Sequence, residues 1–181
     1  MLAPSLFDDA SHGLFLLTPE TELSGFVEGE LREAFLKSGS MVIHLALGDV
    51  PSGRLWDAIA ASARGLMQGL HHDDPPAVVS PHRVSLLEEL QRLHAATKAA
   101  VIVMLEGVER TGHEAHVDDW AAMFALKSAR DQMNRPWLCR LGLVMTSASE
   151  RSLAGLLRSN AAPFYGSIVR RLETEPISQS A

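Results

Sequence analysis

Hydrophobic residues gather in four short, nearly continuous runs, and longer segments with a helical repeat separate these runs. The runs are Gly13–Leu17 and residues 41–47, 99–105 and 141–145. Polar or turn residues bound each of them, and such runs are typical of parallel strands that helices cover on both faces. Residues 167–172 form a weaker run that two arginines interrupt, so we expect a strand at a sheet edge there. Residues 76–80 are a weaker candidate for a further strand.

Apolar positions spaced by three and four residues predict helices between the strands. Such stripes cover residues 23–35, 55–70 and 84–93, and another begins at Val117 and should stop before Pro136. Ser149 is the expected N-cap of a fifth helix. Strands that alternate with helices imply right-handed crossovers. The pattern therefore predicts an α/β fold of three layers, α/β/α, with a mostly parallel five-stranded sheet.

Length and composition are consistent with this prediction and limit the classes of function. The chain has 181 residues, of which 46% are hydrophobic and 21% are charged, as in an ordinary globular domain. We expect an N-terminal arm at residues 1–12, one domain at 13–172 and a tail at 173–181. The net charge of −6 argues against a general binder of DNA or membranes. Cys139 is the single cysteine, which fits a reducing cytoplasm.

The first loop at the carboxyl ends of the strands lacks the pattern that binds phosphates. Ligands of such sheets bind at these ends, and a nucleotide hydrolase needs the GxxxxGK[ST] loop after its first strand. No lysine precedes Lys37, and two carboxylates stand in the loop at residues 18–25. Like charges a few ångströms apart cost about 1–4 kcal/mol. The degenerate loop comprises Thr18, Glu20, Glu22, Ser24 and Gly25. An alternative is that this strand never belonged to a phosphate-loop fold.

Two later strand ends carry single polar residues of interest. A nucleotide hydrolase ends its third strand with two acids, one for Mg²⁺ and one that activates water. Here Leu105 or Gly107 takes the place of one acid, so Glu106 is either a vestige of the pair or a solvated residue. Thr146 ends the fourth strand, where working hydrolases sense the terminal phosphate. The alternative is that Thr146 starts a turn and Ser149 caps the next helix.

The remaining candidates are arginines and histidines. Arg158, Arg170 and Arg171 lie where a finger arginine occurs in AAA+ proteins, and without a phosphate they are candidates for ion pairs or partner contacts. His113 and His116 lack the H-E-x-x-H spacing of a metal site. We therefore expect no catalytic residue, no cofactor and no metal ion.

The chain resembles the N-terminal domain of the BcsE family, which regulates bacterial cellulose secretion. The likeness lies in VIHLALGDVPSGRLWDAI, in PPAVVSPH before VIVMLEGVER, and in LGLVMTSASERSLAGLLRSNAAPFYGSIVRRLE. It implies a degenerate P-loop NTPase fold of the RecA/AAA+ type and a cytoplasmic scaffold that assembles with subunits of a secretion machine. The segments VIVMLEGVER, VMTSAS and LLRSNAAPFYGSIVRRLE also resemble AAA+ helper ATPases of transposition, which keep their phosphate loop and both acids.

Three functional hypotheses follow. The first is a non-catalytic module that binds protein partners, such as an active NTPase subunit or a second copy, through a nucleotide-hydrolase fold. The second is a weak ATPase that draws its cation from Arg32 or Lys37. The third is a DNA-associated helper that contacts DNA through Arg170 and Arg171.

Overall fold

The computed structural model describes residues 13–17, 26–70, 84–111, 116–135, 138–167 and 169–171. The expected arm at residues 1–12, the degenerate loop at 18–25, the candidate strand at 76–80 and the tail at 173–181 lie outside these ranges. The structure therefore tests the strands, the helices and the later loops of the predicted domain, and leaves the phosphate-loop prediction as it stands.

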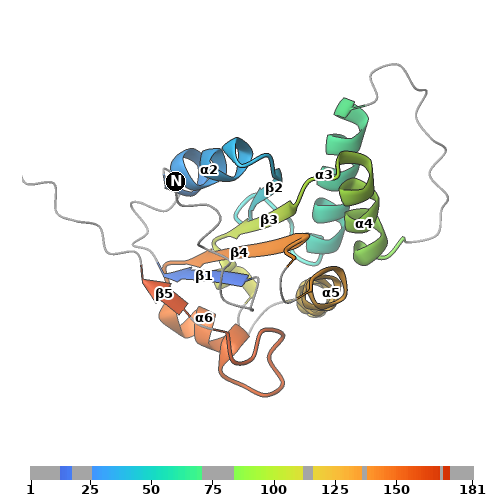
Figure 1. Cartoon of the computed structure of the whole chain (residues 1–181). Helices are drawn as coiled ribbons and strands as arrows, with labels where there is room; N and C mark the ends of the chain where they lie inside the picture. Colours follow the sequence, from blue (N-terminus) through green and yellow to red (C-terminus); the bar gives the residue numbers. More distant parts are fainter. Residues whose placement is uncertain are drawn as a thin grey trace, which may run out of the picture.

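Five parallel strands form one sheet in the order β2-β3-β4-β1-β5 (Figure 1). The strands are β1 (Gly13–Leu17), β2 (Met41–Ala46), β3 (Val101–Glu106), β4 (Leu141–Ser147) and β5 (Val169–Arg171). The expected α/β class and the expected edge position of the last strand are confirmed. The weak run at 167–172 forms a strand of three residues beside β1.

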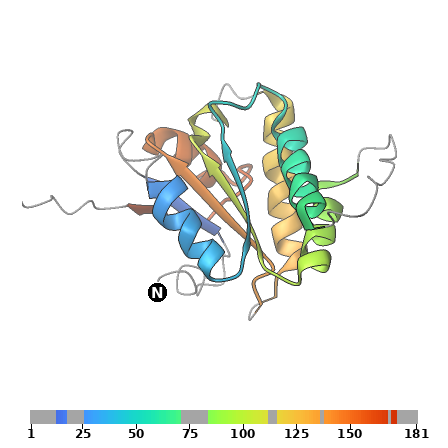
Figure 2. The ribbon, with the colours of Figure 1, turned by 90° about the horizontal axis from the view of Figure 1, so that it is seen from above.

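Helices cover both faces of the sheet, as Figure 2 shows from above. A π-helical turn, η3 (Phe26–Leu31), leads into α2 (Arg32–Lys37) on one face. The other face carries α3 (Leu55–Leu70), α4 (Leu86–Thr97), α5 (Val117–Met133) and α6 (Glu150–Leu157). A 3₁₀ turn, η4 (Val108–Thr111), follows β3. The first crossover runs from β1 past β4 and β3 to β2, and the later ones return in the opposite direction. Right-handed connections place these two groups on opposite faces.

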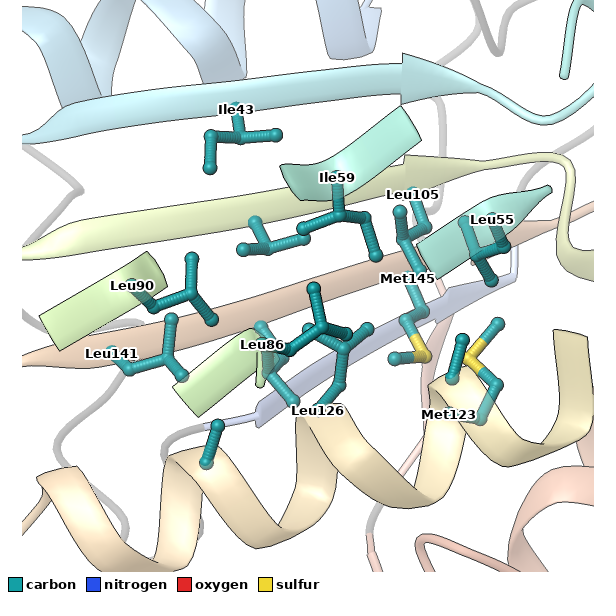
Figure 3. Close-up of a cluster of buried hydrophobic side chains, with 14 of the residues drawn as sticks. Ile43, Leu55, Ile59, Leu86, Leu90, Leu105, Met123, Leu126, Leu141 and Met145 are labelled. Carbon is teal, nitrogen blue, oxygen red and sulfur yellow. The ribbon is translucent and has the colours of Figure 1, made fainter. Parts of the chain in front are cut away.

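Side chains alternate between the two faces, so each strand contributes to two apolar clusters. Odd-numbered strand residues such as Ile43, Leu105 and Met145 form the larger cluster with α3, α4, α5 and α6 (Figure 3). Even-numbered residues such as Ile102 and Val144 form a smaller cluster beneath α2. This alternation decides which side chains the strand ends present to each face.

Two strand boundaries differ from those expected, and the difference moves two candidate residues. The third strand begins at Val101 and includes Glu106, whereas a strand at 99–105 was expected. The fourth strand continues to Ser147, so Thr146 belongs to the strand and does not start a turn. Both strands are longer at this end because Glu106 and Thr146 pair in register. Ser149 caps α6 as expected, since its side chain accepts a hydrogen bond from the Ser152 N–H at 3.2 Å.

Candidate functional site

Three polar side chains form a row across the carboxyl end of the sheet. Glu106 ends β3 and is the register partner of Thr146 on β4, and His44 lies on the neighbouring strand β2. All three are even-numbered strand positions, so they belong to the face that α2 covers. We call His44, Glu106 and Thr146 the polar row. Sequence reasoning selected two of its members.

The Glu106 carboxylate has a partner within the protein. His44 Nε2 lies 3.1 Å from Glu106 Oε2, and each side chain is 13% exposed. Neither chain neighbour of Glu106 is a second acid. Leu105 is buried in the larger cluster on the opposite face, and Gly107 has no side chain and adopts a φ of 74°. The third strand thus ends in one carboxylate, held by an imidazole, where hydrolysis requires two acids.

The end of β4 contains one satisfied hydroxyl and one that has no partner among the described residues. Ser147 Oγ donates to Glu109 Oε1 at 2.8 Å and accepts from the Ser149 N–H at 3.0 Å. The same Glu109 oxygen accepts from the Ala148 N–H. Thr146 Oγ1 is buried and makes no hydrogen bond in the part of the chain that the structure describes. The second carboxylate near this edge, that of Glu109, is therefore occupied in holding the strand end.

A third carboxylate occupies the start of α3, at the same edge of the sheet. Asp119 of α5 accepts hydrogen bonds from the N–H groups of Gly53 at 2.8 Å and Leu55 at 3.1 Å. Free N–H groups at a helix N-terminus attract anions such as phosphate. Here a buried side chain supplies the anion, so these N–H groups are satisfied within the fold.

Neither cation suggested by the sequence lies in the polar row. Lys37 ends α2 just before the chain enters β2 at Met41, so it lies at the amino end of the strands, and it pairs with Glu33 at 2.8 Å. The structure thus excludes Lys37 as the cation of a phosphate site. Arg32 begins α2 and lines a cavity of about 570 Å³ beside His44. Of these two cations, Arg32 alone lies near the polar row.

Of the three C-terminal arginines, Arg158 has a described side chain, and it lies at α6, away from the polar row. Arg158 follows α6, is 73% exposed, and pairs with Glu150 at 3.2 Å. It lines a second cavity, of about 750 Å³, next to Tyr165. Arg170 and Arg171 lie on β5, and their side chains are outside the description. Their predicted contacts with a partner stay a prediction.

Two further sequence candidates have local explanations. Burial raises the pKa of the Cys139 thiol to about 11, so this cysteine stays protonated and unreactive near neutral pH. Of the two histidines weighed as metal ligands, His113 is outside the described residues. His116 precedes α5 and accepts a hydrogen bond from the Asp118 N–H at 3.3 Å.

Comparison with known proteins identifies the type of fold. No protein-family model and no curated protein matches the chain. A Walker-type ATPase of Pyrococcus abyssi superimposes with a TM-score of 0.61 at 16% identity, over 93% of this chain and 49% of that one. The chain has a P-loop NTPase-like fold. The ORC1 protein of Aeropyrum pernix in complex with DNA gives a TM-score of 0.49 at 13% identity, over 97% of this chain and 43% of that one.

The likeness extends to the fold alone at these identities. The chain spans about half the length of these structures, 49% and 43%. The expected RecA/AAA+-like topology is confirmed, whereas neither comparison bears on the resemblance to BcsE. Within the described part of the chain, no helix is both long and apolar enough to cross a membrane.

Sequence reasoning missed His44, Glu109 and Asp119. A signal existed for His44, because it is the one ionisable residue in an otherwise apolar run. No local signal existed for the two acids. Glu109 binds a residue 38 positions away, and Asp119 binds backbone groups 64 and 66 positions away.

Proposed function

We propose that this chain is a non-catalytic binding module that uses a P-loop NTPase-like fold as a platform for protein partners. The observation that carries the proposal is the state of the acids at the carboxyl edge. Glu106 is held by His44, Glu109 by the end of β4, and Asp119 by the start of α3. An ATPase needs acids at this edge that can bind Mg²⁺ and water. The loop sequence at residues 18–25, with two glutamates and no lysine, supports the same interpretation.

The fold provides the stability that such a platform requires. The larger apolar cluster extends beneath four helices, and the three acids link strands, turns and helices at one edge. Buried carboxylates bonded to backbone N–H groups hold loops in fixed positions. In this proposal the site that performs hydrolysis in an NTPase has become a structural element, and outer surfaces contact the partners.

The proposed partners are subunits of a bacterial machine, one of which is an active NTPase of related fold. The sequence resemblance to BcsE supports cellulose secretion as the process and the cytoplasm as the location. This part of the proposal rests on the resemblance alone, and identification of co-purifying proteins from the native host tests it.

A second candidate function is that of a weak ATPase, and one observation favours it. Thr146 Oγ1 is buried at the end of β4 beside Glu106 and has no partner among the described residues. Working hydrolases place a polar residue there to contact the terminal phosphate. In this candidate the cation would have to be Arg32 or a residue outside the described ranges.

Titration calorimetry with ATP and Mg²⁺ separates the two functions. The binding module gives no heat of binding at about 1 mM nucleotide, which corresponds to a binding free energy weaker than about −4 kcal/mol. The weak ATPase gives saturable heat and phosphate release, and both fall in Glu106→Gln and Thr146→Val. Hydrolysis that Glu106→Gln abolishes would refute the binding module.

A further inference from the structure

The strand β2 lies at one edge of the sheet, and no described strand pairs with its outer side, where the Ala46 carbonyl accepts a hydrogen bond from the Asp49 N–H at 3.0 Å. Among the described strands it pairs with β3 alone. The Met41 N–H donates to Ala100 O at 2.8 Å, and the Leu47 N–H donates to Glu106 O at 2.9 Å. Because backbone groups of a strand alternate in direction, the N–H groups of Val42, His44 and Ala46 point away from β3. An extended segment placed beside β2 would find these donors in a row.

This free edge lies at the bottom of a groove between two helices. The cavity of about 570 Å³ has Arg32 of α2 on one side, the middle of β2 at its base, and Ser62 and Gly65 of α3 on the other side. Figure 2 shows β2 between α2 and α3. Apart from its chain neighbours and the backbone of its own helix, no described heavy atom lies within 4 Å of the position that a Gly65 Cβ would take. The α3 wall therefore leaves room for the side chains of an added strand.

The edge lacks the features that usually prevent such pairing. Natural edge strands carry lysine, proline or a bulge. The sequence of β2, MVIHLA, contains neither lysine nor proline, and its register with β3 is continuous over six residues. Its one ionisable residue, His44, is turned toward Glu106. Nothing on the strand itself opposes the addition of another strand.

The charge at the groove indicates which kind of segment fits. Arg32 is the one permanently charged side chain among the described residues that line the cavity, and within the described part of the chain it forms no ion pair. A second copy of the chain would bring an identical cationic groove, with no lining carboxylate to offer. A segment that carries acidic side chains complements Arg32.

We propose that the groove at β2 binds an extended acidic segment of a partner protein, which adds as a strand to the sheet and places a carboxylate beside Arg32. Main-chain hydrogen bonds hold such a segment, and pockets for alternate side chains select it. This inference rests on the proposed function, because it names the surface through which the binding module contacts a partner.

Fluorescence anisotropy with a synthetic probe tests the proposal on the whole chain. The probe is a labelled peptide of about ten residues that alternates valine and glutamate. A lysine-for-glutamate version and a version with N-methyl groups on alternate residues are the matched controls. We expect the acidic peptide to bind, and both control peptides to bind at least about tenfold more weakly.

Two charge reversals on α2 show whether Arg32 is the contact. Arg32→Glu should weaken binding by about fivefold, the upper range for an exposed ion pair. Lys37→Glu makes the same charge change on the same helix at a side chain that is 76% exposed, and it should leave binding unchanged. Equal losses in the two variants would show a general charge effect and overturn the assignment.

Residue-resolved amide exchange shows whether the peptide adds to β2. We expect the peptide to slow exchange at Val42, His44 and Ala46. The inference is refuted if the acidic peptide does not bind, if the lysine peptide binds equally well, or if exchange slows at β5. A stable dimer that the acidic peptide does not dissociate would also refute it. The calorimetry with ATP is independent of these results. If the peptide does not bind, the inference about β2 is refuted while the proposed binding module is unaffected. If ATP is hydrolysed, the binding module is refuted whether or not the peptide binds.

Discussion

The two faces of the sheet end differently at the carboxyl edge. On the face beneath α3, α4, α5 and α6, the strand residues up to Leu105 and Met145 are apolar and buried, and the one polar residue beyond them, Ser147, is hydrogen-bonded to Glu109. On the face beneath α2, the same strands carry polar side chains toward this edge: Glu106 ends β3, Thr146 is the penultimate residue of β4, and His44 lies two residues before the end of β2. The first face therefore stabilises the domain, and the second carries the groups whose chemistry decides between a hydrolase and a binding module.

The largest expected change in stability comes from a substitution on the face beneath α3, α4, α5 and α6. Leu105→Ala should lower the free energy of unfolding by about 2–5 kcal/mol, because it removes buried contacts and leaves a cavity in the larger cluster. Urea denaturation followed by circular dichroism measures the change. Leu36→Ala on α2 is the matched control, since Leu36 is 45% exposed, and it should cost less than about 1 kcal/mol. Equal losses would show that the two faces contribute alike.

An intermediate effect is expected where an acid links helices at the carboxyl edge. Asp119→Ala should cost about 2 kcal/mol, because it leaves the N–H groups of Gly53 and Leu55 without their shared acceptor at the start of α3. Asp118→Ala is the control. The Asp118 side chain is next to Asp119 in the sequence but 61% exposed, so it should contribute less than about 1 kcal/mol. Thermal melts of both variants provide the comparison. If Asp118→Ala cost as much, the buried link would not be what holds this loop.

The sequence sufficed for the class of fold because repeats of apolar residues are local. The run at residues 13–17 and the stripe over 55–70 coincide with observed elements, and the run at 141–145 lies within β4. Strand ends were placed less well, because the pairing of Glu106 with Thr146 extends both strands and depends on residues 40 positions apart.

The candidate site was harder to predict for a related reason. Glu106 and Thr146 could be selected because they interrupt apolar runs, and a register of parallel strands then brings them together. Their environment could not be foreseen. The His44 partner of Glu106 lies 62 positions away, and whether a hydroxyl is satisfied depends on side chains from several elements.

The smallest expected effect concerns the buried Thr146 hydroxyl on the face beneath α2. Thr146→Val should raise the free energy of unfolding by about 1 kcal/mol, because it replaces a buried hydroxyl that lacks a partner among the described residues with a methyl group of similar size. Ser147→Ala, one position along, removes a satisfied hydroxyl and should be destabilising. Urea denaturation in the absence of nucleotide compares the two. A loss of stability in Thr146→Val would mean that this hydroxyl is bonded in solution, and the observation that favours a weak ATPase would then disappear.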